Sequence, residues 1–463
     1  MLISSKLVFV VICAALLGFG AVISASLSRF LLAAVVMTIA WQGGIRMNFF
    51  NMDFTLTYLL IIVLLVWNLV DPQRRLQLKG RSPALLYFWI GVIVFCALSL
   101  IPAMDKFFAL GGVARGVIDV MIFFAALQSL RSARDVQYFT GALMAAMIFQ
   151  GVLCILQFKM PDFKFGVIDE VQSWMWWRSK GTFYHANEMG MYLVFMLPIT
   201  ARVLFSSLMQ GNRRWIYFSG AALLIGGITL FTTSSRGAWV GSAVGISCML
   251  GYDLFRRGIK LKKVLLGLSV PLAILAVVFT MKYGAVFMDR LFSQKAESMW
   301  EGRKKLQSES LDIIQSHPVI GVGYWNYHLQ PITDFVHNMY LLIAAEVGIP
   351  GLALVAGFLI ATLAQISKGM RSRIFFISNL SRGCLASFAG FLVASIPGPD
   401  FWISHPVQMY FWMIVVLQVA LLRLERQTLA QLKTHKPPSR KEAVSQITGA
   451  NEFATRPAYV RKR

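Results

Sequence analysis

The stretch HNMYLLIAAEVGIPGLALVAGFLIATLA, residues 337–364, decides the fold. Apart from Glu346 and the polar residues at its head, it is apolar over the length of a transmembrane helix. Runs of similar length recur along almost the whole chain of 463 residues, which is 57% hydrophobic and only 14% charged, with a mean hydropathy of +0.64. Soluble domains have roughly a quarter charged residues. The sequence therefore predicts an all-α, polytopic membrane protein.

We expect twelve or thirteen spans, because the first two apolar runs are weak and could together form one broken element. The first run resembles a signal peptide, but no clear small-x-small cleavage site is followed by a soluble domain, so we interpret it as a retained span. The expected spans are residues 7–25, 29–45, 55–70, 84–102, 108–129, 137–157, 187–207, 215–232, 237–252, 264–282, 338–364, 383–397 and 407–422.

The net charge of +23 suggests a nucleic-acid partner, but its distribution favours another explanation. Lys and Arg cluster in short segments between spans and in the tail, as in the cytoplasmic loops of membrane proteins. We therefore expect anionic lipids as partners of this charge, and no nucleic acid. The basic segments are residues 72–81, 131–134, 212–214, 255–263, 367–373 and the chain after 423. The intervening connections, which are 103–107, 158–186, 233–236, 283–337 and 398–406, then face the opposite side.

Only one of these outward connections, residues 283–337, is long. Within it, residues 298–318 carry apolar side chains at helical spacing, which predicts an amphipathic helix lying over the bundle at the membrane surface. The apolar positions are Met299, Leu306, Leu311 and Ile314. We divide the chain into a transmembrane domain, residues 1–427, and a polar, basic cytoplasmic tail, residues 428–463, which we expect to be disordered.

Several kinds of activity are disfavoured by missing motifs. The sequence contains no P-loop, no GxGxxG and no DxD, which argues against reactions driven by ATP or a nucleotide sugar. The five cysteines lie in or beside apolar runs without CxxC spacing, so we assign them to packing. We therefore expect neither a metal site nor a cofactor.

Charged side chains at the outward ends of the spans are the candidates for chemistry, because charges beside a membrane are costly. Arg236 lies in a very short outward turn, where few cations are expected. Hydroxyl residues 232–235 precede it, and Gly237, Gly241 and Gly245 follow at a spacing that permits close helix packing. A guanidinium held there would suit a phosphate or diphosphate. The alternative is contact with a lipid phosphate.

A second basic group lies in SWMWWRSKGTFYHANE, residues 173–188. Arg178 and Lys180 are expected to bind either a ligand anion or lipid headgroups. The tryptophans just before them predict an interfacial aromatic belt, with stacking on sugar rings as the alternative. Elsewhere, Arg115 and Asp119 lie one turn apart within a span, and we interpret them as a structural ion pair.

His337 ends the long outward loop and begins a span on the same side as these cations. An imidazole can take a proton from a hydroxyl group, and nearby cations can neutralise a leaving diphosphate. Together these residues suggest transfer of a group from a lipid diphosphate to an alcohol. Glu346, nine residues on, is half a turn out of phase and is not expected to orient His337. His317, His328 and His405 are weaker candidates.

These segments resemble the O-antigen ligase family and its wider superfamily of polysaccharide ligases and polymerases. One family motif is His, then Asn, Ser or Gln, nine residues, Gly, two residues, and Gly, Thr or Tyr; it is matched by His337, Asn338, Gly348 and Gly351. SSRGAWVG, with Arg236, resembles a second motif. SKGTFYHANEMG resembles a third, in which a basic residue precedes Gly-Thr-Phe. The likeness covers about residues 170–360 by motif and the whole chain by hydropathy.

The resemblance implies a GT-C-like glycosyltransferase that takes glycan from undecaprenyl diphosphate on the periplasmic side of the bacterial inner membrane, without metal or ATP. Carried over from the family, His337 would activate the acceptor hydroxyl, and Arg236 with Arg178 or Lys180 would hold the diphosphate. Four further residues of these motifs would support the site: Asn338, His185, Asn187 and Tyr340.

The acceptor distinguishes three possible functions. We favour a ligase that transfers finished polysaccharide to lipid A–core; the alternatives are a polymerase that extends a lipid-linked glycan and an enzyme that modifies protein hydroxyls. A lipid or glycan transporter belongs to a different class and would show inverted repeats and interrupted helices. The chain shows no internal repeat, and its candidate charges gather on one side, which argues against transport.

Overall fold

The computed structural model describes residues 27–41, 46–49, 52–70, 84–160, 178–257, 294–332 and 334–434. Among the sequence predictions, the spans at 7–25 and 264–282 and the tryptophan-rich run before Arg178 lie outside these ranges. Side chains are described throughout these ranges except at 46–54, 254–257, 294–300 and 432–434.

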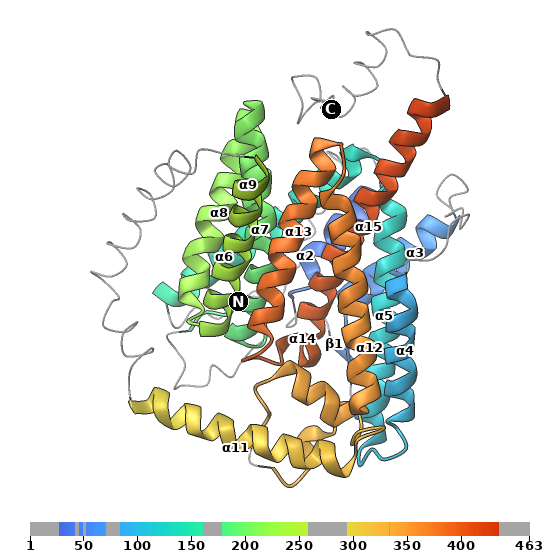
Figure 1. The fold of residues 1–463 in the computed structure, drawn as a ribbon, viewed down its shortest axis with the longest axis vertical. Helices are drawn as coiled ribbons and strands as arrows, with labels where there is room; N and C mark the ends of the chain where they lie inside the picture. The colour runs from blue at the N-terminus through green and yellow to red at the C-terminus, as the bar shows by residue number, and fades with distance from the viewer. Residues whose placement is uncertain are drawn as a thin grey trace, which may run out of the picture.

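Every expected span within the described ranges coincides with a helix (Figure 1). Seven described helices are long and apolar enough to cross a membrane, and α2, α3 and α4 are shorter apolar helices. The polytopic helical membrane fold is therefore confirmed. The helices are α2 (Leu27–Thr38), α3 (Leu56–Val70), α4 (Ala84–Leu98), α5 (Lys106–Ser129), α6 (Ala133–Lys159), α7 (Ala186–Gln210), α8 (Arg213–Thr232), α9 (Arg236–Arg257), α12 (Met339–Met370), α13 (Phe375–Ala394) and α15 (His405–Thr434).

The sequence analysis did not predict a short β-hairpin between α2 and α3. Strands β1 (Arg46–Phe49) and β2 (Met52–Thr55) pair antiparallel, with Phe49 opposite Met52. This register leaves two residues for the turn, a common hairpin length. The hairpin begins directly after the end predicted for the span at 29–45, whereas helix α2 already stops at Thr38. Because the hairpin contains several Met and Phe residues, hydropathy alone does not distinguish it from the neighbouring helices.

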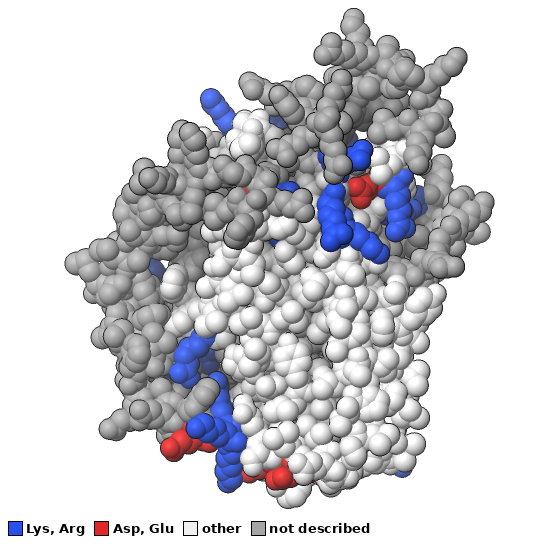
Figure 2. Space-filling model, viewed as in Figure 1, with Lys and Arg blue, Asp and Glu red and all other residues white. Residues whose placement is uncertain are grey.

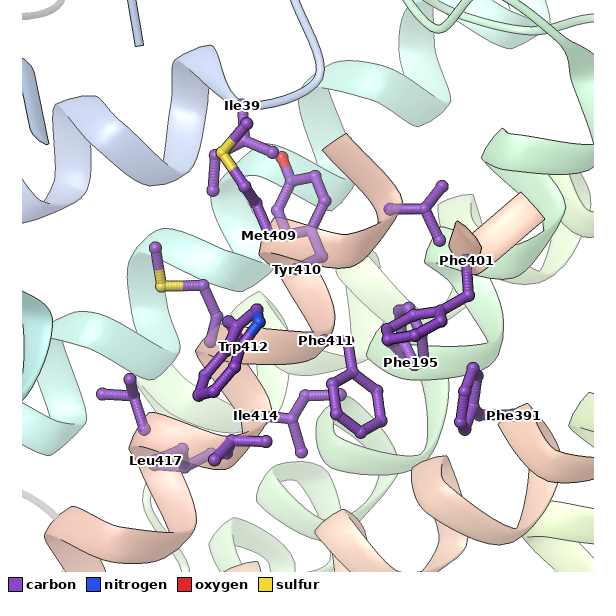
Figure 3. Packing of buried hydrophobic residues seen from close by; sticks show 14 of the residues in the cluster. Ile39, Phe195, Phe391, Phe401, Met409, Tyr410, Phe411, Trp412, Ile414 and Leu417 are labelled. Atoms are coloured by element: carbon purple, nitrogen blue, oxygen red, sulfur yellow. The ribbon is translucent and has the colours of Figure 1, made fainter. Parts of the chain in front are cut away.

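The core is built around α15, which is almost fully buried among the other helices. Its consecutive residues Tyr410, Phe411 and Trp412 are all buried, and Figure 3 shows their rings directed to different neighbours. The Phe411 ring lies 4.9 Å from Phe391 of α13 and 5.1 Å from Phe401 of the short helix α14 (Asp400–Ile403), centroid to centroid. Aromatic pairs at this separation stabilise packing beyond their buried area. They fix α14, which precedes α15, to the centre of the bundle.

The predicted close packing of the α9 glycines is confirmed. A Cβ atom on Gly241 would lie 2.6 Å from the carbonyl oxygen of Gly390 in α13, and one on Gly245 would lie 2.4 Å from that of Ala386. Both distances are too short for any larger residue, so the two helix backbones touch. This contact holds α9, and with it Arg236 at its first turn, in a fixed position.

The long outward loop contains the expected helix, α11 (Gln294–Ser316), which lies across the bundle at the end opposite to the C-terminal end of α15 (Figure 1). Leu306 is buried, and Ile314 packs against the core. The prediction for Leu311 is wrong: its side chain is 47% exposed, and Ser310 takes the buried position beside it. The 3₁₀ helix η2 (Tyr327–Leu329) follows in the same loop.

Charged residues gather at the two ends of the molecule. Figure 2 shows Lys and Arg together with Asp and Glu at the upper and lower edges of one face, separated by a broad uncharged band. Such a band is expected where a bundle meets lipid. At the C-terminus, α15 continues to Thr434, through the boundary predicted at residue 428, and the remainder of the predicted tail lies outside the described residues.

Candidate active site

The start of α12 places His337 at the outward end of the bundle. Asn338 is the N-cap: its side-chain oxygen accepts hydrogen bonds from the backbone N–H of Tyr340 (2.9 Å) and Leu341 (3.1 Å). This is the usual role of asparagine before a helix. The Tyr340 hydroxyl donates to the carbonyl of Leu392 in α13 at 3.1 Å. Asn338 and Tyr340 therefore fix the backbone next to His337.

The glycine of the same motif breaks α12. Gly348 has φ 77° and ψ 172°, a conformation that only glycine adopts readily, and a Cβ atom there would lie 2.2 Å from the carbonyl oxygen of Val319. The backbone groups freed by the break bond to the segment after α11. Ile349 N–H donates to the Pro318 carbonyl at 2.8 Å, and Gly323 N–H donates to the Glu346 carbonyl at 3.0 Å. These hydrogen bonds at the break attach the loop that ends at His337 to α12.

Substitution of Gly348 by alanine should destabilise this attachment. The backbone strain alone is worth about 1–3 kcal/mol, and the contact with Val319 forces the loop to move. We expect a clear fall in the melting temperature of the purified protein, measured by tryptophan fluorescence, together with reduced activity. Gly220→Ala in α8 is the control, because a Cβ atom there meets nothing within 4 Å. Equal melting temperatures for the two variants would contradict this interpretation.

The two basic segments predicted from sequence lie against each other. The Arg178 guanidinium donates from Nε to the Thr233 carbonyl (2.9 Å) and from Nη2 to the Asn187 side-chain oxygen (2.6 Å). Ser179 N–H donates to the Thr232 carbonyl at 3.0 Å. Residues 178–180 therefore pack on the turn that leads into Arg236. Asn187 orients Arg178.

The same turn is conformationally restricted. Ser234 has φ 51°, a left-handed conformation that is uncommon outside glycine. Ser235 N–H reaches the Thr233 hydroxyl at 3.4 Å, and α9 begins directly afterwards at Arg236. Arg236 is thus placed by a tight turn on one side and by the α9–α13 contact on the other.

Lys180 and His185 complete this basic group. The backbone N–H of Gly181 donates to the Gln157 side chain of α6 at 2.8 Å, which holds the segment that carries Lys180. His185 caps α7 by accepting the Asn187 N–H at its Nδ1 (3.1 Å). Burial lowers the pKa of His185 to about 4, and the charges of Arg178 and Lys180 and the His337 imidazole act in the same direction. His185 is therefore a neutral helix cap near pH 7.

Electrostatic effects link His337 to these cations. Burial lowers the pKa of His337, Arg303 lowers it further, and Asp334 partly opposes the shift. Arg303 is half-buried on α11, and its own pKa is lowered by burial and then by Arg236. His337 is thus linked to Arg236 through Arg303, and to Arg178 and Lys180 through His185. Arg303 was not a candidate from sequence, because it lies in a helix rich in charges of both signs.

Residues 221–356 match the protein family described as O-antigen ligase. This region of the chain is similar to the O-antigen ligase family. The matched region runs from α8 to the first turns of α12 beyond its break, and it contains Arg236, Arg303, His337 and Gly348. The family implies a membrane-embedded glycosyltransferase that acts on lipid-linked glycans. No curated protein matches the chain.

A buried acid borders the candidate site. Asp400 is the first residue of α14, and burial raises its pKa to about 6 although Arg178 acts in the opposite direction. Sequence reasoning placed residues 398–406 in an outward loop and did not single out Asp400. In the described part of the chain, no group of three or more His, Cys, Asp and Glu side chains is arranged to hold a metal ion.

The prediction that Arg115 and Asp119 form an ion pair is wrong: no such pair is present among the described residues. Asp119 lies 3.3 Å from Nε2 of His405, whose Nδ1 is 2.6 Å from the Tyr58 hydroxyl. Arg115 instead donates to the Tyr324 hydroxyl at 3.1 Å. Both side chains find partners from elements distant in sequence, which helical spacing alone does not reveal.

The remaining candidates from sequence have other contacts. Glu346 accepts a hydrogen bond from the Trp402 ring at 2.7 Å, so it does not orient His337, as expected. His405 is buried in the bundle. His317 is exposed beside Ser316, and His328 stacks on Phe335 with centroids 5.8 Å apart. Among the histidines of the basic group, His185 interacts with Arg178 and Lys180, and His337 interacts with Arg303.

Proposed function

We propose that this protein transfers polysaccharide from undecaprenyl diphosphate to a hydroxyl group of lipid A–core on the periplasmic side of the bacterial inner membrane. The observation that supports the proposal is a series of neighbouring charges: Arg303 acts on the half-buried His337, Arg236 acts on Arg303, and Arg178, Lys180 and His337 all act on His185. His337 lies at the start of α12; Arg178, Lys180, Arg236 and Arg303 come from three other segments.

In the proposed reaction His337 takes the proton of the acceptor hydroxyl, and the oxygen of that hydroxyl attacks the anomeric carbon of the donor. The bond between that carbon and the diphosphate oxygen breaks, and the electron pair leaves with the diphosphate. Arg236 and Arg178 neutralise the charge that develops there, with Lys180 and Arg303 beside them. A single displacement of this kind inverts the anomeric centre. Undecaprenyl diphosphate remains as the product.

The transfer rate should depend on pH through His337, which must be neutral to act as a base. Because its pKa is lowered from the usual value of 6.5, the rate should be constant near neutrality and fall only as the pH drops below 6.5. Arg303→Gln should move this fall to higher pH, since the arginine lowers the pKa. Asp334→Asn should move it to lower pH. Rate profiles with purified protein and lipid-linked donor test this; shifts in the same direction would contradict the assignment.

Deletion of the gene with analysis of the cell's glycolipids tests the proposed function. For a ligase, lipid A–core should lack polymer while undecaprenyl-linked polymer accumulates, and the wild-type gene should restore the transfer. Accumulation of single repeat units would indicate a polymerase instead. Unchanged lipopolysaccharide with loss of a glycoprotein would indicate transfer to protein. Unchanged glycolipids and glycoproteins would overturn the proposal.

A further inference from the structure

A cavity of about 280 Å³ lies between α2, α6 and α8. It is close to the first residues of α8, whereas the proposed active site adjoins the last residues of that helix. The 20 residues of α8 rise by about 30 Å, the thickness of the hydrocarbon core of a bilayer. The cavity therefore belongs to the opposite end of the bundle, the end that carries the basic connections, and the proposed reaction does not use it.

The walls of the cavity are apolar along the helices. Its lining includes the rings of Phe30, Phe139 and Phe218, and the small residues Ala142 and Ala145 leave the space between them. From Asp135 at its polar end to Ala145, the lining covers ten residues of α6, or about 15 Å. A narrow apolar space of this length suits a single hydrocarbon chain.

The polar end of the cavity is fixed by contacts between side chains. Arg29 at the start of α2 forms an ion pair with Asp135 at the start of α6, at 2.6 Å. The Arg29 guanidinium also lies 5.1 Å from the ring centre of Tyr138, and that of Arg134 lies 5.7 Å from the same ring. Cations over an aromatic face are held by its charge distribution. The tyrosine thus keeps two guanidinium groups at the entrance.

Further cations surround this entrance. Arg134, Arg213 and Arg214 are exposed. The last two directly precede Trp215, which lines the cavity and whose ring would lie 3.4 Å from a Cβ atom on Gly141. Asp135, the acid in the lining, is already bonded to Arg29. The charge at the entrance therefore favours an anion above an apolar channel.

We propose that this cavity binds one acyl chain of an anionic glycerophospholipid, with the lipid phosphate held by Arg134 and Arg213. The chain occupies the space beside Ala142, Ala145 and Phe218, and the phosphate meets the arginines at the membrane surface. Phosphate accepts paired hydrogen bonds from guanidinium groups. An anionic lipid is favoured over a zwitterionic one, because its headgroup carries no cation that the arginines would repel. The bound lipid fills the space between α6 and α8 at the end remote from the glycan chemistry.

Native mass spectrometry of the delipidated full-length protein, titrated with dioleoyl phosphatidylglycerol or dioleoyl phosphatidylcholine, tests the proposal. We expect one phosphatidylglycerol to bind at lower concentration than any further lipid. Ala145→Trp fills the apolar space and should weaken this first binding by about tenfold or more, because several methylene groups lose their contacts. Val94→Trp is the matched control, since Val94 is 49% exposed on α4, away from the cavity. If Ala145→Trp does not fold, Ala142→Phe replaces it.

The arginines are tested separately. The double variant Arg134→Gln and Arg213→Gln should remove the preference for phosphatidylglycerol over phosphatidylcholine. The same change at Arg371 and Arg373, both exposed in the connection between α12 and α13, should retain it. Equal binding of both lipids to the wild-type protein, or unchanged first binding in the variants that fill the cavity, would overturn the proposal.

Discussion

Replacement of His337 by alanine should abolish measurable glycan transfer while the protein stays folded. A positioned general base contributes about 10²–10⁴-fold to a rate. The His337 ring lies within the electrostatic reach of Arg303 and of His185, which in turn interacts with Arg178 and Lys180. The fold should persist, because the side chain is only half-buried and Asn338 still caps α12. Transfer with purified protein, lipid-linked donor and acceptor glycolipid gives the measurement.

Two other histidines provide controls for this experiment. His317→Ala removes an exposed ring in the same outward loop and should leave the rate unchanged. His185→Asn keeps a side chain that can cap α7 and should reduce the rate much less than His337→Ala. Transfer by the His337 variant at the wild-type rate would refute the assignment of the base.

Arg236→Lys should lower kcat/KM by about 10- to 100-fold, although the charge is kept. A guanidinium can bind two oxygens of a diphosphate at once, whereas an ammonium acts as a single charge, and a charge-assisted hydrogen bond is worth about 1.5–3 kcal/mol. Arg236 is held at the first turn of α9 by its packing on α13, so the lysine cannot recover the lost contact by moving the helix.

The alternative role of Arg236 predicts a different result. If the side chain only contacts lipid headgroups, lysine should serve equally well and the rate should be that of the wild type. Arg371→Lys, an exposed change at the other end of α12, controls for general effects on the membrane protein. A loss of more than tenfold at Arg236 alone supports binding of the donor diphosphate.

Sequence was sufficient to predict the helices because a membrane demands long apolar segments whose backbone groups bond internally. It was also sufficient to predict close packing along one face of α9, since its glycines are spaced four residues apart, but it did not identify α13 as the partner. It failed for the burial of Leu311, because the sequence does not show which face of α11 packs against the bundle. It also missed the hairpin of β1 and β2.

The candidate site was only partly accessible from sequence. The motifs identified His337, Arg236 and Arg178, because charged groups at membrane edges are rare and therefore conspicuous. Arg303 and Asp400 approach these residues only through the positions of α11 and α14 in the folded protein. The partners of Asp119 come from α15 and were not predictable from its own helix. Long-range packing, which no local pattern records, decided these contacts.

The last part of the outward loop is attached at two points, which gives this protein an exchangeable surface between them. One end is bonded at the break of α12 next to Gly348, and the other at Met339, whose N–H donates to the Ser395 carbonyl at 3.1 Å. Between these anchors, Tyr324 and Tyr327 are buried, whereas Leu329 and Pro331 are exposed and can be exchanged without loss of a buried contact. A chimera that carries residues 329–331 of a relative would keep His337 in place while presenting a new surface beside it. Acceptor preference can then diverge independently of the transfer chemistry.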